Sequence, residues 1–227
     1  MTVFAFNVIL IVAITALAFK YLRLREITSG EHLPDLAYLG GLASLIDSAE
    51  GYASPHSIVM AQNAAEIGRR IGIAEPGILS IRLAALLHDC GQINLPRDIF
   101  KKNGPLTPED WFLVKTHPLL GELALRRAVP ILEEVPSLVR WHHERWDGSG
   151  YPDRLQGEEI PLAARILAVV DAASAMSQAR PYRPARSDQQ IQHELVRLSG
   201  LHFDPEIVNV RGKIASLQAA NTGGRGN

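Results

Sequence analysis

The stretch ILSIRLAALLHD, residues 78–89, decides the fold of this chain. It is apolar on nearly every side until it reaches His88 and Asp89. A helix that is hydrophobic all round lies buried inside a domain. A buried, ionised aspartate is costly unless a cation or a metal compensates its charge. The stretch therefore predicts a helical core and a chemical site at the end of its central helix.

The rest of the chain continues this pattern. The segment PLAARILAVVDAASAM (161–176) is a second nearly all-apolar helix, with Asp171 in its midst. From residue 37 almost to the end the periodicity is helical, with no alternating strand and no internal repeat. Residues 147–161 form the longest loop, because they are rich in glycine and proline. We expect an all-α domain over residues 37–216 and a flexible tail over 217–227.

Helix starts are marked by a capping residue that is followed by proline at the first helical position. The three examples are Ser54-Pro55, Thr107-Pro108 and Asp204-Pro205.

Composition excludes some functions. The 227 residues carry 23 basic and 24 acidic side chains, so nothing in the net charge favours binding to a DNA or RNA duplex. Cys90 is the only cysteine, which excludes an internal disulfide and fits a reducing compartment.

The first 19 residues contain no charged side chain, and a helix of about 20 apolar residues crosses a bilayer. Basic residues follow at Lys20, Arg23 and Arg25, which by the positive-inside rule places the remainder in the cytoplasm. We therefore expect a single transmembrane helix (1–19) in the inner membrane and a juxtamembrane linker (20–36). The alternatives are a buried helix and a signal peptide cleaved after Ala16-Leu17-Ala18.

Polar residues gather at helix ends and on apolar faces. They comprise five imidazoles and two carboxylates: His56, His88, His117, His142, His143, Asp89 and Asp171. Each alone is more often a hydrogen-bonded core residue, a cap or a solvated helix end than a ligand. Neighbouring helical residues point about 100° apart, so His142 and His143 cannot face one ion from the same side of a helix. Either one of the pair is incidental, or a group with more than one point of attachment lies between them, and only the joint pattern indicates a metal site.

These residues lie in sequence blocks that resemble the HD superfamily of metal-dependent phosphohydrolases, and within it the HD-GYP family. The resemblance covers nearly all of the predicted domain. In chain order the blocks are HS (56–57), HDCG (88–91), INLPRDIFKKNGPLTPEDW (93–111), HP (117–118), HHERWDGSGYP (142–152), RILAVVD (165–171) and RPYR (180–183).

The resemblance implies an HD-type helical bundle with two divalent transition-metal ions, iron or manganese, bridged by Asp89. The implied ligands are His56, His88, Asp89, His117, His142, His143 and Asp171. His143 is the less certain of the adjacent pair. The usual substrate of the family is cyclic di-GMP, which is opened to linear pGpG and in some members cut further to GMP. Two neighbouring metals suit this reaction, because they activate water and stabilise charge on the phosphoryl oxygens.

The resemblance also implies substrate contacts from Arg180 and Arg183, since a guanidinium grips phosphate or stacks on a base. A solvated helix end is the alternative reading of these arginines. The loop that contains Tyr151 is expected to shape the rim of the substrate pocket, and Tyr151 is expected to contact the substrate.

Three positions depart from the family pattern. Gln92 replaces the lysine of HDxGK, so a cation near the reacting phosphate is missing, at a cost on the order of a hundredfold in rate. Ser174 replaces the second acid of DxxDA, and we expect it to lie behind a ligand and to loosen the site. Tyr52 stands where some members carry an acid for a third metal, which favours two metals here.

Three functions remain open from the sequence. The first is a membrane-anchored cyclic di-GMP phosphodiesterase that is slow because of Gln92, and the second is an HD hydrolase of another phosphorylated substrate. The third is a degenerate domain that binds metal or nucleotide without turnover and signals through partners. A homodimer or a signalling partner would supply regulation.

Overall fold

A computed structural model describes residues 56–100, 102, 104–128, 132–179 and 184–223, together with residues 43, 44 and 47. The expected transmembrane helix (1–19), the linker (20–36) and the Ser54-Pro55 cap lie outside these residues. Among the described residues, no helix has the length and apolar character needed to cross a membrane.

The described chain is helical, with one isolated bridge between Ser199 and Phe203 and no strand among the described residues. The elements are α3 (His56–Ile71), α4 (Glu75–Leu87), η1 (Cys90–Asn94), α5 (Arg97–Phe100), α6 (Pro108–Val114), α7 (His117–Ala128), α8 (Val135–Trp141), η2 (Gly157–Glu159), α9 (Leu162–Ser177), α10 (Asp188–Arg197) and α11 (Pro205–Gly223).

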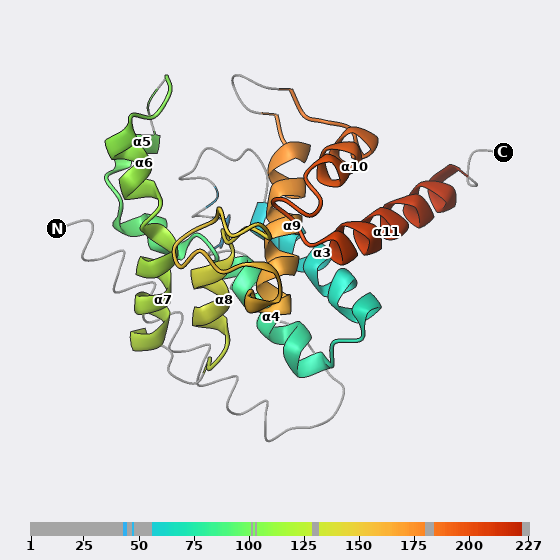
Figure 1. Ribbon diagram of the computed structural model, residues 1–227, viewed down its shortest axis with the longest axis horizontal. Coiled ribbons are helices and arrows are strands. Elements are labelled where there is room, and N and C mark those ends of the chain that lie inside the picture. Colours follow the sequence, from blue (N-terminus) through green and yellow to red (C-terminus); the bar gives the residue numbers. More distant parts are fainter. Residues whose placement is uncertain are drawn as a thin grey trace.

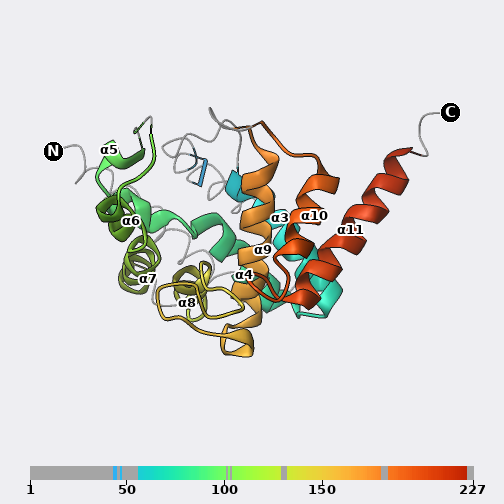
Figure 2. The ribbon, with the colours of Figure 1, turned by 45° about the horizontal axis from the view of Figure 1, so that its top comes forward.

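The two apolar segments form the centre of the bundle, as predicted. α4 packs against α3, α8 and α9, and α9 also packs against α3. Side chains such as Leu87 and Leu167 are fully buried, and each such burial stabilises the fold by about 1.5–3 kcal/mol. Both views show α5–α7 on one side of α9 and α10–α11 on the other (Figures 1 and 2).

Helix caps confirm two of the expected starts. α6 begins at Pro108, where the Thr107 hydroxyl accepts from the backbone N–H of Asp110 at 3.2 Å. α11 begins at Pro205, and Asp204 Oδ1 accepts from the backbone N–H of Glu206 at 2.8 Å. α11 then continues to Gly223, past the domain boundary expected at residue 216. The apolar residues along this helix lack a clean helical period, and for that reason its length does not show in the pattern.

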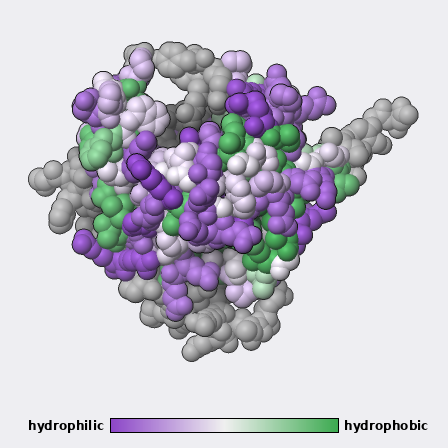
Figure 3. All heavy atoms as spheres, in the orientation of Figure 1, coloured by the Kyte–Doolittle hydropathy of each residue, from purple (hydrophilic) through white to green (hydrophobic). Residues whose placement is uncertain are grey.

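The face drawn in Figure 3 is largely hydrophilic where the loop between α8 and α9 lies in front. Hydrophobic side chains gather over α6 and α7 at its left edge. The exposed apolar residues of these helices include Trp111, Phe112, Leu119 and Leu123.

Candidate metal centre

The ends of three helices place three histidines. His88 directly follows the last residue of α4, His142 directly follows the last residue of α8, and His117 is the first residue of α7. All three are 1% exposed. A helix end gives each ring a fixed direction and brings side chains from distant parts of the chain to one point.

Each of these histidines is held by a backbone carbonyl three residues earlier in the chain. The Nδ1–O pairs are His88–Ala85 at 2.9 Å, His117–Val114 at 2.7 Å and His142–Val139 at 2.6 Å. A carbonyl oxygen only accepts, so each Nδ1 carries the hydrogen. Such partners fix the tautomer and orientation of a ligating imidazole and direct Nε2 away from the helix.

The seven predicted ligands lie together in two neighbouring groups. Within each group one ligand atom per residue lies within 4.8 Å of the others. The Asp89 group contains Asp89, His117, His142 and His143, and the Asp171 group contains His56, His88 and Asp171.

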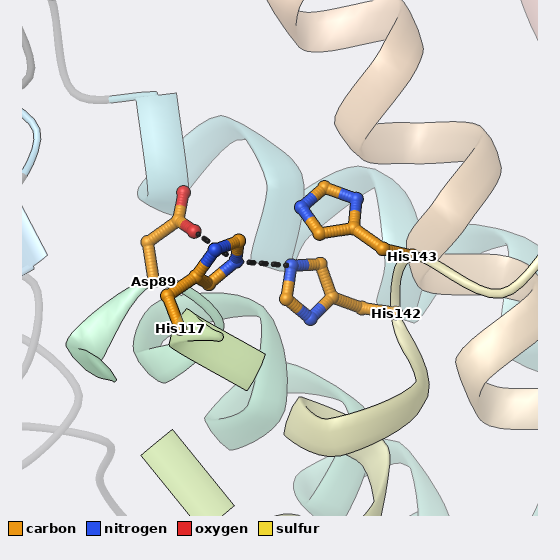
Figure 4. Close-up of side chains that lie close together, drawn as sticks. All are labelled: Asp89, His117, His142 and His143. Carbon is orange, nitrogen blue, oxygen red and sulfur yellow. Dashed lines mark hydrogen bonds and ion pairs between the residues drawn. The ribbon is translucent and has the colours of Figure 1, made fainter. Parts of the chain in front are cut away.

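Asp89 connects the two groups. Its Oδ1 lies 3.0 Å from Nε2 of His117, in its own group, and its Oδ2 lies 2.8 Å from Nε2 of His88, in the Asp171 group. In Figure 4 the ring of His117 lies between the carboxylate of Asp89 and the ring of His142. One carboxylate thus offers an oxygen to each group, which is the arrangement that bridging of two ions requires.

The Asp171 group has a partner at the position where the family pattern carries a second acid. His56 Nε2 lies 3.2 Å from Asp171 Oδ1, and on the opposite side of the ring Nδ1 lies 2.9 Å from the Ser174 hydroxyl. His56 is fully buried and Ser174 is 3% exposed. The serine therefore keeps the hydrogen-bonding contact behind the ligand, although it brings no charge.

The two carboxyl groups are held ionised by their neighbours. Burial raises the pKa of Asp89, but the charge of His88 and the hydrogen bond from His117 outweigh it and hold that pKa well below its usual range. Burial likewise raises the pKa of Asp171, and the hydrogen bond from His56 outweighs it. Both carboxylates are therefore available as anionic ligands.

The Asp89 group fits a divalent metal ion. The Nε2 atoms of His117 and His142 face each other at 3.4 Å, and both rings use Nδ1 to donate to a carbonyl. Burial lowers the pKa of His142 well below its usual range, so its Nε2 carries a lone pair at neutral pH. A lone pair and a carboxylate that converge in a buried space need a cation between them. Imidazole and carboxylate together suit a transition metal.

His143 completes the group from the loop that follows α8. Its ring centroid lies 4.0 Å from that of His142 and 5.0 Å from that of His117. Burial lowers its pKa to about 3, so the ring is neutral and can ligate. Tyr151 packs against it with ring centroids 4.9 Å apart, and Lys115 Nζ lies 5.5 Å from the tyrosine ring centroid.

Two close backbone approaches make the site possible. A Cβ on Gly91 would lie 2.0 Å from the backbone oxygen of His117 and 2.6 Å from the nitrogen of Gly121. A Cβ on Gly150 would lie 2.4 Å from the backbone nitrogen of Arg145. The first contact docks η1 against α7, and the second folds the loop back onto the residues that follow the histidine pair.

The other predicted site residues have different outcomes. Gln92 lies in η1, partly buried, and its Oε1 is buried without a hydrogen-bond partner among the described residues. Tyr151 contacts His143 of the Asp89 group, and its role in binding substrate stays a prediction. Arg180 and Arg183 lie outside the described residues, and their role stays a prediction.

Sequence reasoning missed Glu144, which anchors the loop. Its side chain is 2% exposed, and its Oε1 accepts from the backbone N–H groups of Asp153 at 2.6 Å and Arg154 at 3.0 Å. Asp153 in turn accepts from Arg140 at 2.6 Å and from Trp141 at 2.7 Å. The acidic residue beside the histidine pair was the available signal, but only the folded loop reveals its partners.

Sequence reasoning also missed a cavity of about 360 Å³ beside the two groups. It is lined by His143 and Asp171 of the two groups and by two arginines outside them, Arg145 and Arg186. The local sequence around Arg186 gives no signal for this placement.

Comparisons with known proteins find related sequences. The family model described as an HD domain matches residues 41–207. Over 143 residues the chain is 41% identical to a cyclic di-GMP phosphodiesterase of Thermotoga maritima, with 63% of this chain and 39% of the relative covered. Over 170 residues it is 34% identical to the 3'3'-cGAMP-specific phosphodiesterase 2 of Vibrio cholerae, with 74% of this chain and 33% of the relative covered.

A solved structure shares the fold. The cyclic GMP-AMP-specific phosphodiesterase V-cGAP3 of Vibrio cholerae superposes with a TM-score of 0.63 at 22% identity, over 78% of this chain and 48% of that one. This chain spans less than half the length of these relatives.

Proposed function

The chain belongs to the HD domain family, and on this premise we propose that it is a metal-dependent phosphodiesterase that opens cyclic dinucleotides. The family match and the relatives confirm the resemblance that the HD and GYP blocks predicted. The preferred substrate is cyclic di-GMP, which is opened to linear pGpG, with GMP as the product of a second cleavage.

The observation that carries this proposal is the position of Asp89 between two sets of imidazoles. Its two oxygens lie 3.0 Å and 2.8 Å from histidines of different groups. A single structural ion would need only one set of ligands. Two adjacent sets around a shared carboxylate favour a dinuclear hydrolytic site.

Both groups suit iron or manganese, because they mix nitrogen and oxygen donors. When bound, two such ions supply Lewis acidity that activates a water molecule and stabilises charge on the phosphoryl oxygens. The protein's own contribution is preorganisation: carbonyls hold His88, His117 and His142, and Ser174 holds His56. Since these contacts exist before substrate arrives, the ligands need little rearrangement during the reaction.

Gln92 favours a slow enzyme and also supports an alternative function. A glutamine carries no charge and no transferable proton at neutral pH, so the leaving oxygen loses a cationic partner. A domain that binds the nucleotide and signals through partners without turnover is the alternative that this residue supports.

The test uses the full chain in detergent, loaded with manganese or ferrous iron and incubated with cyclic di-GMP, followed by chromatography of the products. We expect pGpG with both metals. His88→Ala and Asp89→Ala should lose metal and activity, whereas His193→Ala, which removes an exposed histidine of α10, should keep both. Binding of cyclic di-GMP without any linear product would leave the signalling function instead.

We also propose that residues 1–19 anchor the protein in the inner membrane with the HD domain in the cytoplasm. The 19 uncharged residues and the basic residues that follow them support this topology. A fluorescent protein fused to the C-terminus should fluoresce and sediment with membranes. A chain that remains in the supernatant after ultracentrifugation would refute the anchor.

A further inference from the structure

The cavity beside the metal centre is lined both by residues of the two metal-binding groups and by charged residues outside them. His143 and Asp171 belong to the two groups, and Arg186 and Glu194 lie outside them. Its apolar wall includes Met176 of α9. α9 and α10 lie side by side (Figure 2), and both contribute residues to the lining of the cavity. A volume of about 360 Å³ is at the lower end of the range for small-molecule pockets, which suits part of a dinucleotide rather than the whole molecule.

Arg186 is held in place while its charge remains available. Its backbone N–H donates to the carbonyl of Met176 at 3.0 Å, and its guanidinium contacts the Met176 sulfur at 3.3 Å. Glu194 is the acid of the cavity, but Arg197 binds it with two hydrogen bonds, at 2.7 Å and 3.2 Å. The same carboxylate lies 3.9 Å from Arg186. Because Arg197 is the closer partner of Glu194, Arg186 can bind an additional anion.

Arg145 supplies a second cation nearer to the metal centre. It is exposed, and its guanidinium makes no hydrogen bond or ion pair within the described parts of the chain. Arg145 lies two residues after His143 in the chain, and both line the cavity.

We propose that this cavity binds the half of the cyclic dinucleotide that is not cleaved, with Arg186 and Arg145 on its phosphate and the apolar wall against its base. The assignment rests on the proposed phosphodiesterase function. A cyclic dinucleotide carries two phosphodiester groups, and only one can occupy the metal centre at a time. The second needs positive charge nearby, and guanidinium groups bind phosphate through paired, charge-assisted hydrogen bonds.

The test compares Arg186→Gln with Arg69→Gln in the full, manganese-loaded chain. Arg69 is the matched control, since it is an exposed arginine that pairs with Glu75 and does not line the cavity. A contact made equally in the ground state and the transition state changes KM rather than kcat. For cyclic di-GMP we expect Arg186→Gln to raise KM about tenfold or more and to change kcat by less than about threefold. Arg69→Gln should keep the KM of the unaltered protein.

A second substrate separates the two proposals. Bis(p-nitrophenyl) phosphate carries one phosphodiester and has no second phosphate for the cavity. Arg186→Gln should therefore lower kcat/KM for cyclic di-GMP about tenfold relative to kcat/KM for bis(p-nitrophenyl) phosphate. Hydrolysis of cyclic di-GMP with an unchanged KM and ratio in Arg186→Gln would overturn the cavity assignment alone. Hydrolysis of the small diester without binding or hydrolysis of cyclic di-GMP would overturn both proposals.

Discussion

Replacing Gly91 by alanine should remove one of the two metal sites while the fold persists. The added Cβ would lie 2.0 Å from the backbone oxygen of His117, whereas ordinary contact begins at 3.4 Å. η1 and α7 must therefore separate by about 1.4 Å, because neither backbone can turn aside as a flexible side chain does. Metal ligands tolerate errors of about 0.2 Å, so His117 can no longer share an ion with Asp89.

The magnitude follows from the same geometry. Overpacking of this kind lowers the free energy of unfolding by about 1–3 kcal/mol. A displacement of about 1 Å at a catalytic site costs about a hundredfold in rate. His56, His88 and Asp171 do not touch the added methyl group among its nearest contacts. We therefore expect the variant to retain about one metal ion per chain instead of two.

The assay is metal analysis of the manganese-loaded protein after gel filtration, with circular dichroism to verify folding and urea denaturation to measure stability. Gly104→Ala is the control, since a Cβ at that position meets nothing within 4 Å. Two metal ions per chain and undiminished turnover in Gly91→Ala would refute the argument that this glycine sets the distance between Asp89 and His117.

Three further predictions concern the surroundings of the site. Ser174→Ala should weaken metal binding about 10- to 100-fold by removing the partner of His56, whereas Ser174→Asp should preserve it. Equal metal affinities of Ser174→Ala and the unaltered protein would contradict this. Gln92→Lys should raise kcat about tenfold or more by restoring a cation, and an unchanged kcat would show that this charge is not limiting. Asp153→Asn should lower the free energy of unfolding by about 1–3 kcal/mol at pH 7, because Asp153 accepts two hydrogen bonds from Arg140. Those contacts hold the pKa of Asp153 below 3.8. The stabilisation is therefore present above about pH 3.8 and lost as pH falls through the lower folded-state pKa. Urea titrations should show a smaller difference in the free energy of unfolding between Asp153→Asn and the unaltered protein at pH 3 than at pH 7, and an undiminished difference would contradict this.

The sequence predicted the elements of this protein better than it predicted their contacts. Uniformly apolar segments predicted the central helices α4 and α9, because a helix that is hydrophobic on every side is stable only when the rest of the domain surrounds it. The sequence also led to all seven residues of the two groups, since polar residues at helix ends and within apolar helices are visible in a linear pattern. Arg186 could not be found in this way. Its place at the cavity depends on how α10 packs against α9, which no local period encodes.

The adjacent histidines His142 and His143 reach the same group although neighbouring residues of a helix point in different directions. The 100° divergence of neighbouring helical residues applies only while the helix continues, and α8 ends at Trp141. His142 still donates from Nδ1 to Val139 within the last turn, whereas His143 lies in the loop that Glu144 holds by accepting two backbone N–H groups. The first histidine is therefore positioned by the end of a helix, and the second by the loop that Glu144 holds. A substitution of Glu144 should thus displace His143 and Tyr151 while it leaves His142 in place, so the positions of the two adjacent histidines can be changed independently.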